Sequence, residues 1–191
     1  MINIYTDGSS AASRSGWGWV MPYADGTYEY DNGLEEHATN QRMELTAALK
    51  ALQFWEKNYS DDDVTIHSDS AYFCNCYFDK WWTNWVDNGW VNSRKEPITN
   101  RDIWENLIKF FQNPQVHICK VKGHSGHPYN ELADKIATGI AIPVKTYNQL
   151  IYDEKNDKIN IELSEILLDF QMKKYPVNEI IKRIRKVCGC E

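Results

Sequence analysis

Four acidic residues stand where helices and strands could bring their carboxylates together. Asp7 and Asp69 end the segments "INIYTD" and "VTIHSD", which alternate in the manner of strands. Glu44 lies within an amphipathic helical pattern, and Asp134 lies in a helical pattern that follows a further strand. Ligand sites in open α/β sheets lie beyond the carboxyl ends of the strands. We therefore expect these side chains to meet at one rim of a sheet.

Such a cluster favours chemistry with divalent cations. Neighbouring carboxylates raise one another's pKa, and hard cations with oxygen ligands, such as Mg²⁺ or Mn²⁺, relieve the repulsion. Two ions about 4 Å apart can activate water and stabilise the leaving oxygen of a phosphoryl displacement. A single aspartate after a strand is ordinarily a turn former or a cap. Only the combination of four supports the metal hypothesis.

The segments around these acids predict an α/β fold in which an antiparallel hairpin set feeds a mixed sheet. Asp25-Gly26 is a hairpin signal, and Thr39 or Asn40 is the expected N-cap of the first helix. The expected strands are 2–8, 16–23, 26–34, 64–70 and 116–121, and the expected helices start near 39 and cover 72–85, 98–111 and 130–142.

The composition is that of one globular domain with a small appendage. The 191 residues are 42% hydrophobic and 25% charged, with a net charge of −6. No apolar run approaches the roughly 20 residues of a membrane span, and "MINIYTDGSS" lacks a secretory signal. Five cysteines without a disulfide-rich spacing favour reduced thiols. We expect a cytoplasmic protein with no membrane partner.

Four sequence blocks, in order, resemble the signature of the type 1 ribonuclease H family. They are "YTDGS", "TNQRMEL", "HSDS" and "VKGHSGHPYNELAD", and the resemblance covers about residues 1–142. It implies a five-stranded mixed sheet, three strands antiparallel and the rest parallel, flanked by helices in a catalytic domain of residues 1–145. It also implies an endonuclease that cuts the RNA strand of RNA–DNA hybrids and leaves 3′-hydroxyl and 5′-phosphate ends.

The resemblance assigns roles to individual residues. Two Mg²⁺ ions, for which Mn²⁺ can substitute, would be held by Asp7, Glu44, Asp69 and Asp134. His124, in the loop "KGHSGH", matches a histidine that assists proton transfer or product departure, which suits a side chain that titrates near neutral pH. The matching substrate-binding positions are Thr39, Asn40, Gln41, Trp81, Trp85, Trp90, Lys95 and Asn100. Polar residues such as Thr39 and Asn100 could equally be simple helix caps.

The segment of residues 80–90, "KWWTNWVDNGW", matches the substrate-binding protrusion of the family, called here the handle. Val86, Asp87 and Asn88 stand where lysine and arginine are common in relatives. We therefore expect weaker hybrid affinity than a basic handle gives. Tyr77, Trp81 and Trp85 have the spacing of one helix face, so some handle tryptophans are expected to pack.

Residues 146–191 lie outside the resemblance. We expect a linker or hairpin followed by two short helices. From Met172 onward the chain contains six basic and two acidic residues, which gives this segment a net charge of 6 − 2 = +4. This tail is either an auxiliary contact for nucleic acid or a protein partner, or a helical pair that packs through Ile180, Ile181, Ile184 and Val187 with a solvated basic face.

Two other functions compete with the hybrid nuclease. A catalytically silent hybrid-binding module is expected to lack at least one carboxylate, yet all four are present. A DNA-directed nuclease of the same superfamily would share scattered acids but not "TNQRMEL" together with "GHSGH". A monomer is the oligomeric state that the resemblance implies.

Overall fold

The computed structural model describes residues 1–11, 14–24, 26–139, 166, 179–182 and 184. The chain divides into two compact units, and the larger comprises Met1–Tyr23 and Tyr28–Pro143. Most of the predicted C-terminal hairpin and helices lies outside the described residues. Of the tail residues that are described, Ile166 and Ile180 are helical and buried, whereas Ile181, which was expected to pack together with Ile180, is 44% exposed.

One five-stranded sheet forms the centre of the larger unit, with the order β3-β2-β1-β4-β5. Its strands are β1 (Ile2–Ala11), β2 (Arg14–Pro22), β3 (Tyr28–Glu35), β4 (Val64–Ser68) and β5 (Val116–Lys120). The first three are antiparallel, and β4 and β5 continue the sheet parallel to β1. This confirms the predicted mixed sheet, in which three antiparallel strands are followed by parallel ones.

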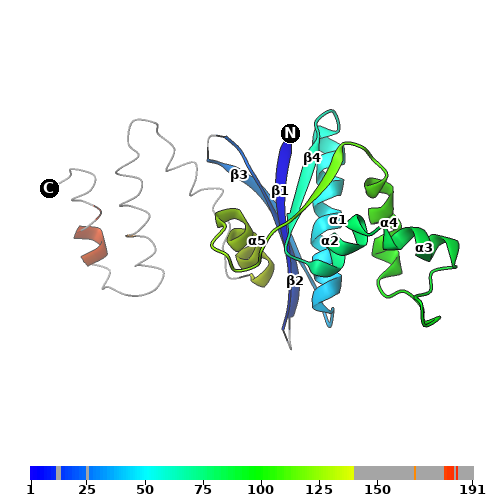
Figure 1. Ribbon diagram of the computed structural model, residues 1–191. Helices are drawn as coiled ribbons and strands as arrows, with labels where there is room; N and C mark the ends of the chain where they lie inside the picture. Colours follow the sequence, from blue (N-terminus) through cyan, green and yellow to red (C-terminus); the bar gives the residue numbers. More distant parts are fainter. Residues whose placement is uncertain (12–13, 25, 140–165, 167–178, 183, 185–191) are drawn as a thin grey trace. The chain divides into compact units, whose positions relative to one another are not determined.

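Helices cover both faces of the sheet (Figure 1). They are α1 (Asn40–Tyr59), α2 (Ala71–Phe78), α3 (Trp81–Asp87), α4 (Arg101–Phe111) and α5 (Pro128–Thr138). The long helix α1 packs on β1, β2 and β4, with α2, α3 and α4 on the same side, whereas α5 packs on β1 and β2 from the opposite side.

Two apolar cores follow from this layering. The larger core lies between α1, α4 and the sheet, and its fully buried side chains include Trp55, Phe73 and Trp104. The smaller core lies under α5 and joins Tyr5 and Val20 to Ala133 and Ile136. Because strand side chains alternate between faces, Ile4 belongs to the larger core and Tyr5 to the smaller.

Two predictions about local structure were wrong. Asp7 does not end its strand, because the long hairpin partner β2 carries β1 on to Ala11. The segment 72–85 is not one helix. Lys80 adopts a left-handed backbone with φ 51°, which separates α2 from α3. Tyr77 and Trp81 therefore do not share a continuous helix face.

Helix α5 lies close to β2 because Gly18 of that strand has no side chain. A Cβ atom on Gly18 would lie 2.6 Å from Ile136 Cγ2 and 2.9 Å from the Ala137 nitrogen.

Among the described helices, none is long and apolar enough to cross a membrane.

We predict that Gly18→Ala pushes α5 away from β2. Overpacking of this kind costs about 1–3 kcal/mol of unfolding free energy, which urea denaturation would measure. A loss below about 0.5 kcal/mol, within the range of surface substitutions, would contradict the close approach of α5.

Candidate active site

Parallel strand pairing brings Asp7 and Asp69 side by side. Thr6 of β1 is in register with Ser68, the last residue of β4. The residue that follows each of them in the chain is an aspartate, so both acids stand at the edge where β4 ends. Asp7 is 8% exposed, and its Oδ1 accepts a 2.7 Å hydrogen bond from the Gly8 amide. The predicted placement on neighbouring central strands is confirmed.

Glu44 reaches the same place from α1. Thr39 caps this helix by accepting a hydrogen bond from the Arg42 amide, so Glu44 lies just beyond the first turn. A Cβ on Gly8 would overlap the Glu44 backbone nitrogen, so only glycine lets α1 come this near β1. The side chain is 8% exposed, and its Oε1 accepts a 3.2 Å hydrogen bond from Asn40 Nδ2.

Asp7, Glu44 and Asp69 form one compact group, with a carboxylate oxygen from each within 4.8 Å of the others. Burial, with the charges of Asp69 and then Asp134, raises the pKa of Asp7 to about 7. Burial, with the charges of Asp7 and then Asp69, raises the pKa of Glu44 to about 9. Repulsion and desolvation thus favour protonated carboxyls in the metal-free protein.

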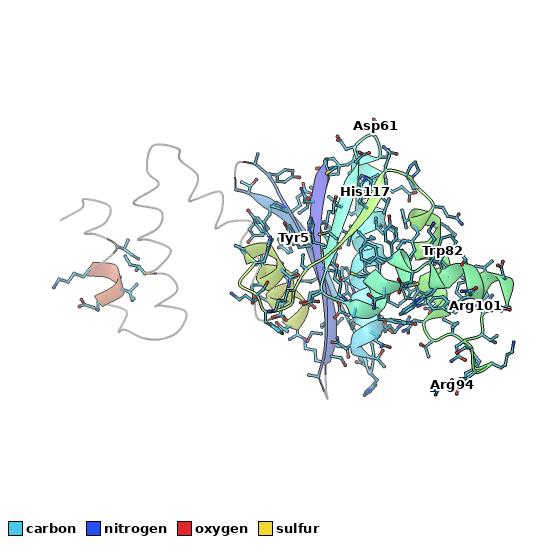
Figure 2. The ribbon with its side chains drawn as sticks, viewed as in Figure 1. Tyr5, Asp61, Trp82, Arg94, Arg101 and His117 are labelled. Atoms are coloured by element: carbon cyan, nitrogen blue, oxygen red, sulfur yellow. The ribbon has the colours of Figure 1, made fainter. Side chains whose placement is uncertain are left out.

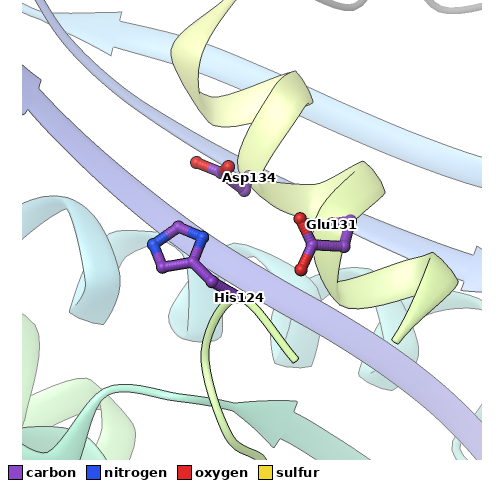
Figure 3. A group of neighbouring side chains, drawn as sticks. All are labelled: His124, Glu131 and Asp134. Atoms are coloured by element: carbon purple, nitrogen blue, oxygen red, sulfur yellow. The ribbon is translucent and has the colours of Figure 1, made fainter. Parts of the chain in front are cut away.

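A second group lies beside the first and contains Asp134. His124, Glu131 and Asp134 each offer a ligand atom within 4.8 Å of the other two. Figure 3 shows the two acids extending from α5 toward the imidazole, which comes from the loop before the helix. The charges of both Asp134 and Glu131 raise the pKa of Asp7, so the two groups share one electrostatic environment.

The first group suits a hard divalent cation. All of its donors are carboxylate oxygens, the ligands that Mg²⁺ and Mn²⁺ prefer. Within the described chain, Glu44 Oε2 is buried and has no hydrogen-bond partner. A buried, unpartnered oxygen is costly, and a cation between the carboxylates would satisfy it. The residues present therefore fit the predicted metal.

The loop that carries His124 touches the first group. A Cβ on Gly123 would lie 2.5 Å from Asp69 Oδ2. The next residue, His124, is exposed and has a left-handed backbone with φ 50°. The absence of a side chain at Gly123 thus lets the backbone of this loop approach the Asp69 carboxylate.

The predicted substrate contacts at the start of α1 have different surroundings. Thr39, Asn40 and Gln41 are exposed, but Thr39 is the helix cap and Asn40 holds Glu44. Asn100 immediately precedes α4 in a left-handed conformation, and its side chain makes no capping hydrogen bond. The side chain of Asn100 is therefore not used as the simple cap that was its alternative role.

The handle tryptophans differ in exposure. Trp85 is 8% exposed and packs against Trp104, with ring centroids 5.4 Å apart, which argues against the predicted substrate contact. Trp81 and Trp90 are half-buried, and the Arg101 guanidinium lies 4.9 Å from the Trp90 ring centroid. Lys95 is exposed and lines a pocket of about 760 Å³ with Trp81 and Trp85. Figure 2 shows Trp82, Arg94 and Arg101 at this end of the unit.

Sequence reasoning missed two charged residues of this region. Glu131 lies three positions before Asp134 on α5, and this spacing places both on one helix face. Arg42 lies inside "TNQRMEL" and forms ion pairs with Glu35 and Asp102. Its position two residues before Glu44, a catalytic candidate, was the available signal.

Comparison with known sequences gives a single family. Residues 1–142 match the profile of the RNase H family. The chain is 43% identical over 138 residues to Ribonuclease H of Syntrophomonas wolfei subsp. wolfei, covering 71% of this chain and 92% of that protein. It is 40% identical over 138 residues to Ribonuclease H of Moorella thermoacetica, covering 71% and 88%.

Solved structures agree with this result. The PFV RNase H domain superposes with a TM-score of 0.60 at 26% identity, covering 72% of this chain and 92% of that chain. The foamy viral protease-reverse transcriptase in complex with RNA/DNA hybrid gives a TM-score of 0.63 at 25% identity. That match covers 72% of this chain but only 19% of the viral chain.

We predict that the metal-free protein loses stability as the pH rises from about 4 toward 9. The folded pKa values of Asp7 and Glu44 exceed their ordinary values of 3.8 and 4.5. The folded state therefore binds more protons than the unfolded state within this window, and the free energy of unfolding falls with pH.

Asp7→Asn should relieve this penalty in the metal-free protein. We expect its Tm to exceed that of the unmodified chain at pH 8 by about 2–8 °C, the equivalent of ~1–2 kcal/mol, with a smaller difference at pH 5. Thermal unfolding in a chelator at both pH values measures this. An equal Tm difference between Asp7→Asn and the unmodified chain at pH 5 and at pH 8 would rule out an electrostatic origin of this difference.

Proposed function

This chain belongs to the RNase H family, and from that premise we propose that it hydrolyses the RNA strand of RNA–DNA hybrids. The observation that carries the proposal is the convergence of Asp7, Glu44 and Asp69 within 4.8 Å, in a region whose full length matches the family. We assign catalysis to residues 1–145. The predicted cytoplasmic location, monomeric state and role of residues 146–191 stay predictions.

Divalent cations are part of the proposal. Ribonucleases H are metal-dependent endoribonucleases, and the acidic groups of this chain suit such ions. We assign the binding of two Mg²⁺ ions, which Mn²⁺ can replace, to Asp7, Glu44, Asp69 and Asp134. When bound, these ions supply the positive charge that offsets the charge developing on the phosphate oxygens.

The proposed task of the carboxylate side chains is to position the cations and to balance their charge. Asp7, at the edge where the neighbouring strand β4 ends, and Glu44, on the first turns of a 20-residue helix, are held by rigid elements, which suits a site that must keep its geometry. Asn40 fixes Glu44 Oε1 and leaves Oε2 available. Water adds to the scissile phosphorus while the bond from phosphorus to the 3′ oxygen breaks, which leaves a 3′-hydroxyl and a 5′-phosphate.

His124 is the proposed carrier of a proton. Its imidazole is exposed and close to both Glu131 and Asp134, so it can exchange protons with water as well as with the reaction. The departing 3′ oxygen needs a proton, and an imidazole can act as a general acid. The Gly126 amide donates a 3.3 Å hydrogen bond to Glu131 Oε1, which links the histidine loop to α5.

Recognition of the hybrid is assigned to the exposed start of α1 and to the handle. Asn40 and Gln41 present amides that can reach the RNA strand, whose 2′-hydroxyl distinguishes it from DNA. Thr39 and Asn100 are the proposed contacts to a DNA-strand phosphate. Trp81, Trp90 and Lys95 extend this surface across the handle, while Trp85 supports it from the core.

The presence of all four carboxylates in the chain disfavours a catalytically silent hybrid-binding module. A DNA-directed nuclease is distinguished from the proposed enzyme by the substrate that it cleaves. We predict Mg²⁺-dependent cleavage of an RNA–DNA hybrid, and little cleavage of duplex DNA or duplex RNA of the same sequence. Preferential cleavage of duplex DNA would overturn the proposed function.

Asp7→Asn should abolish hybrid cleavage, by at least about 10³-fold in kcat, because it removes a charge that must hold the cations. Asp61→Asn is a matched control. Asp61 is exposed and lies before the start of β4, whereas Asp69 follows its end. Equal activity of the two variants would refute the assignment of Asp7.

His124→Ala should lower kcat by about 10²-fold, the scale of a general acid–base contribution, and leave KM within a few-fold. His117→Ala, on the far strand β5, tests for a general effect of losing a histidine. A change in KM alone would place His124 in substrate binding instead.

A further inference from the structure

One arginine beside the proposed DNA-binding surface is paired with two carboxylates. Arg42 Nε donates a 2.5 Å hydrogen bond to Glu35 Oε1, at the end of β3. Its Nη1 and Nη2 donate to Asp102 Oδ1 and Oδ2, at 3.1 and 2.9 Å, on the first turn of α4. The guanidinium thus bridges α1 to both α4 and the sheet.

The two carboxylates have different roles on this cation. Asp102 takes the paired fork of the guanidinium, the geometry in which arginine and carboxylate match best, and Arg42 lowers the pKa of Asp102. One negative charge already balances Arg42. Glu35 adds a second, so these three side chains together carry a net charge of −1.

Arg42 also lies next to the residues proposed to hold a DNA-strand phosphate. Its Nη1 is 3.5 Å from Asn100 Oδ1, and its backbone amide donates to Thr39 Oγ1 at 3.2 Å. The Arg42 side chain is 28% exposed. A phosphate that reaches Thr39 and Asn100 therefore comes close to the guanidinium, and also to the surplus carboxylate.

The structure holds Glu35 in this place. Glu35 pairs with Ser15 in the register of β2 and β3. The connection from β3 to α1 turns at His37, with φ 57°, and the next carbonyl, of Ala38, accepts 2.8 Å hydrogen bonds from both Ser10 and Ser15. The backbone of the β3–α1 connection thus holds Glu35 beside Arg42.

From this arrangement we propose that Glu35 determines hybrid affinity by occupying a position on Arg42 that a DNA-strand phosphate takes when the hybrid binds. Carboxylate and phosphate oxygens accept the same hydrogen bonds from a guanidinium, so one oxyanion can replace the other. The inference rests on the proposed function. On this proposal, a phosphate replaces the Glu35 carboxylate on Arg42 when the hybrid binds. Part of the free energy gained from the phosphate contact therefore offsets the loss of the Glu35 contact.

Hybrid binding by Glu35→Gln tests this directly. The full-length chain, carrying Asp7→Asn to prevent cleavage, is titrated with one RNA–DNA hybrid in Mg²⁺ at several salt concentrations. We expect Glu35→Gln to tighten Kd by about 3- to 10-fold near 0.1 M salt. The slope of log K against log salt should steepen by about one unit, as for one additional cation that acts on phosphate.

Glu36→Gln is the matched control, because it removes the same charge from the adjacent exposed residue, which makes no ion pair in the described part of the chain. We expect a change below about twofold. In a chain that also carries Arg42→Gln, the gain from Glu35→Gln should disappear. The comparison of Glu35→Gln with Glu36→Gln remains decisive if loss of Arg42 impairs folding.

Three results would overturn the role of Glu35: no tightening, equal tightening by Glu36→Gln, or a gain that persists without Arg42. In each of these cases the parent chain still binds hybrid, and the proposed function stands. A parent chain that binds no hybrid would instead defeat the proposed function, and this inference with it.

Discussion

Repulsion among carboxylates that are partly withdrawn from water is the constraint on which this structure depends. Asp7 and Glu44 are each 8% exposed and lie beside Asp69. Such an arrangement opposes folding unless protons or cations neutralise it. The fold holds the acids together nonetheless, with the larger apolar core on one side of the sheet and the smaller core under α5 on the other. The metal-free protein is thus less stable than it would be without this cluster, but its carboxylates already lie where cations can bind them.

The two acidic groups are supported in different ways. The first rests on strand pairing, on a capped helix and on the bare backbone of Gly8, so its geometry follows from rigid elements. The second combines α5 with an exposed loop, where His124 has a left-handed backbone. This division suits a site that must fix its charges and also exchange protons and products with solvent.

Polar side chains of the substrate surface already have partners inside the protein. Thr39 caps α1, Asn40 holds Glu44, and Arg42 pairs with two carboxylates. Under the proposed function, hybrid binding replaces the Arg42–Glu35 contact as well as water. The handle adds a further acidic residue, Asp87, and we predict that both features lower the affinity for a nucleic-acid backbone.

Local patterns determined much of this protein. The alternation of apolar residues predicted the strands, the expected cap at Thr39 or Asn40 predicted the start of α1, and four motifs in order predicted the family. Tertiary structure decided what these patterns cannot encode. The break at Lys80 depends on a left-handed residue that helix periodicity does not reveal. The burial of Trp85 depends on α4, and the pairing of Arg42 joins residues 7 and 60 positions away. Long-range contacts of this kind follow from how layers pack, because spacing along a chain specifies only which face of an element a side chain occupies.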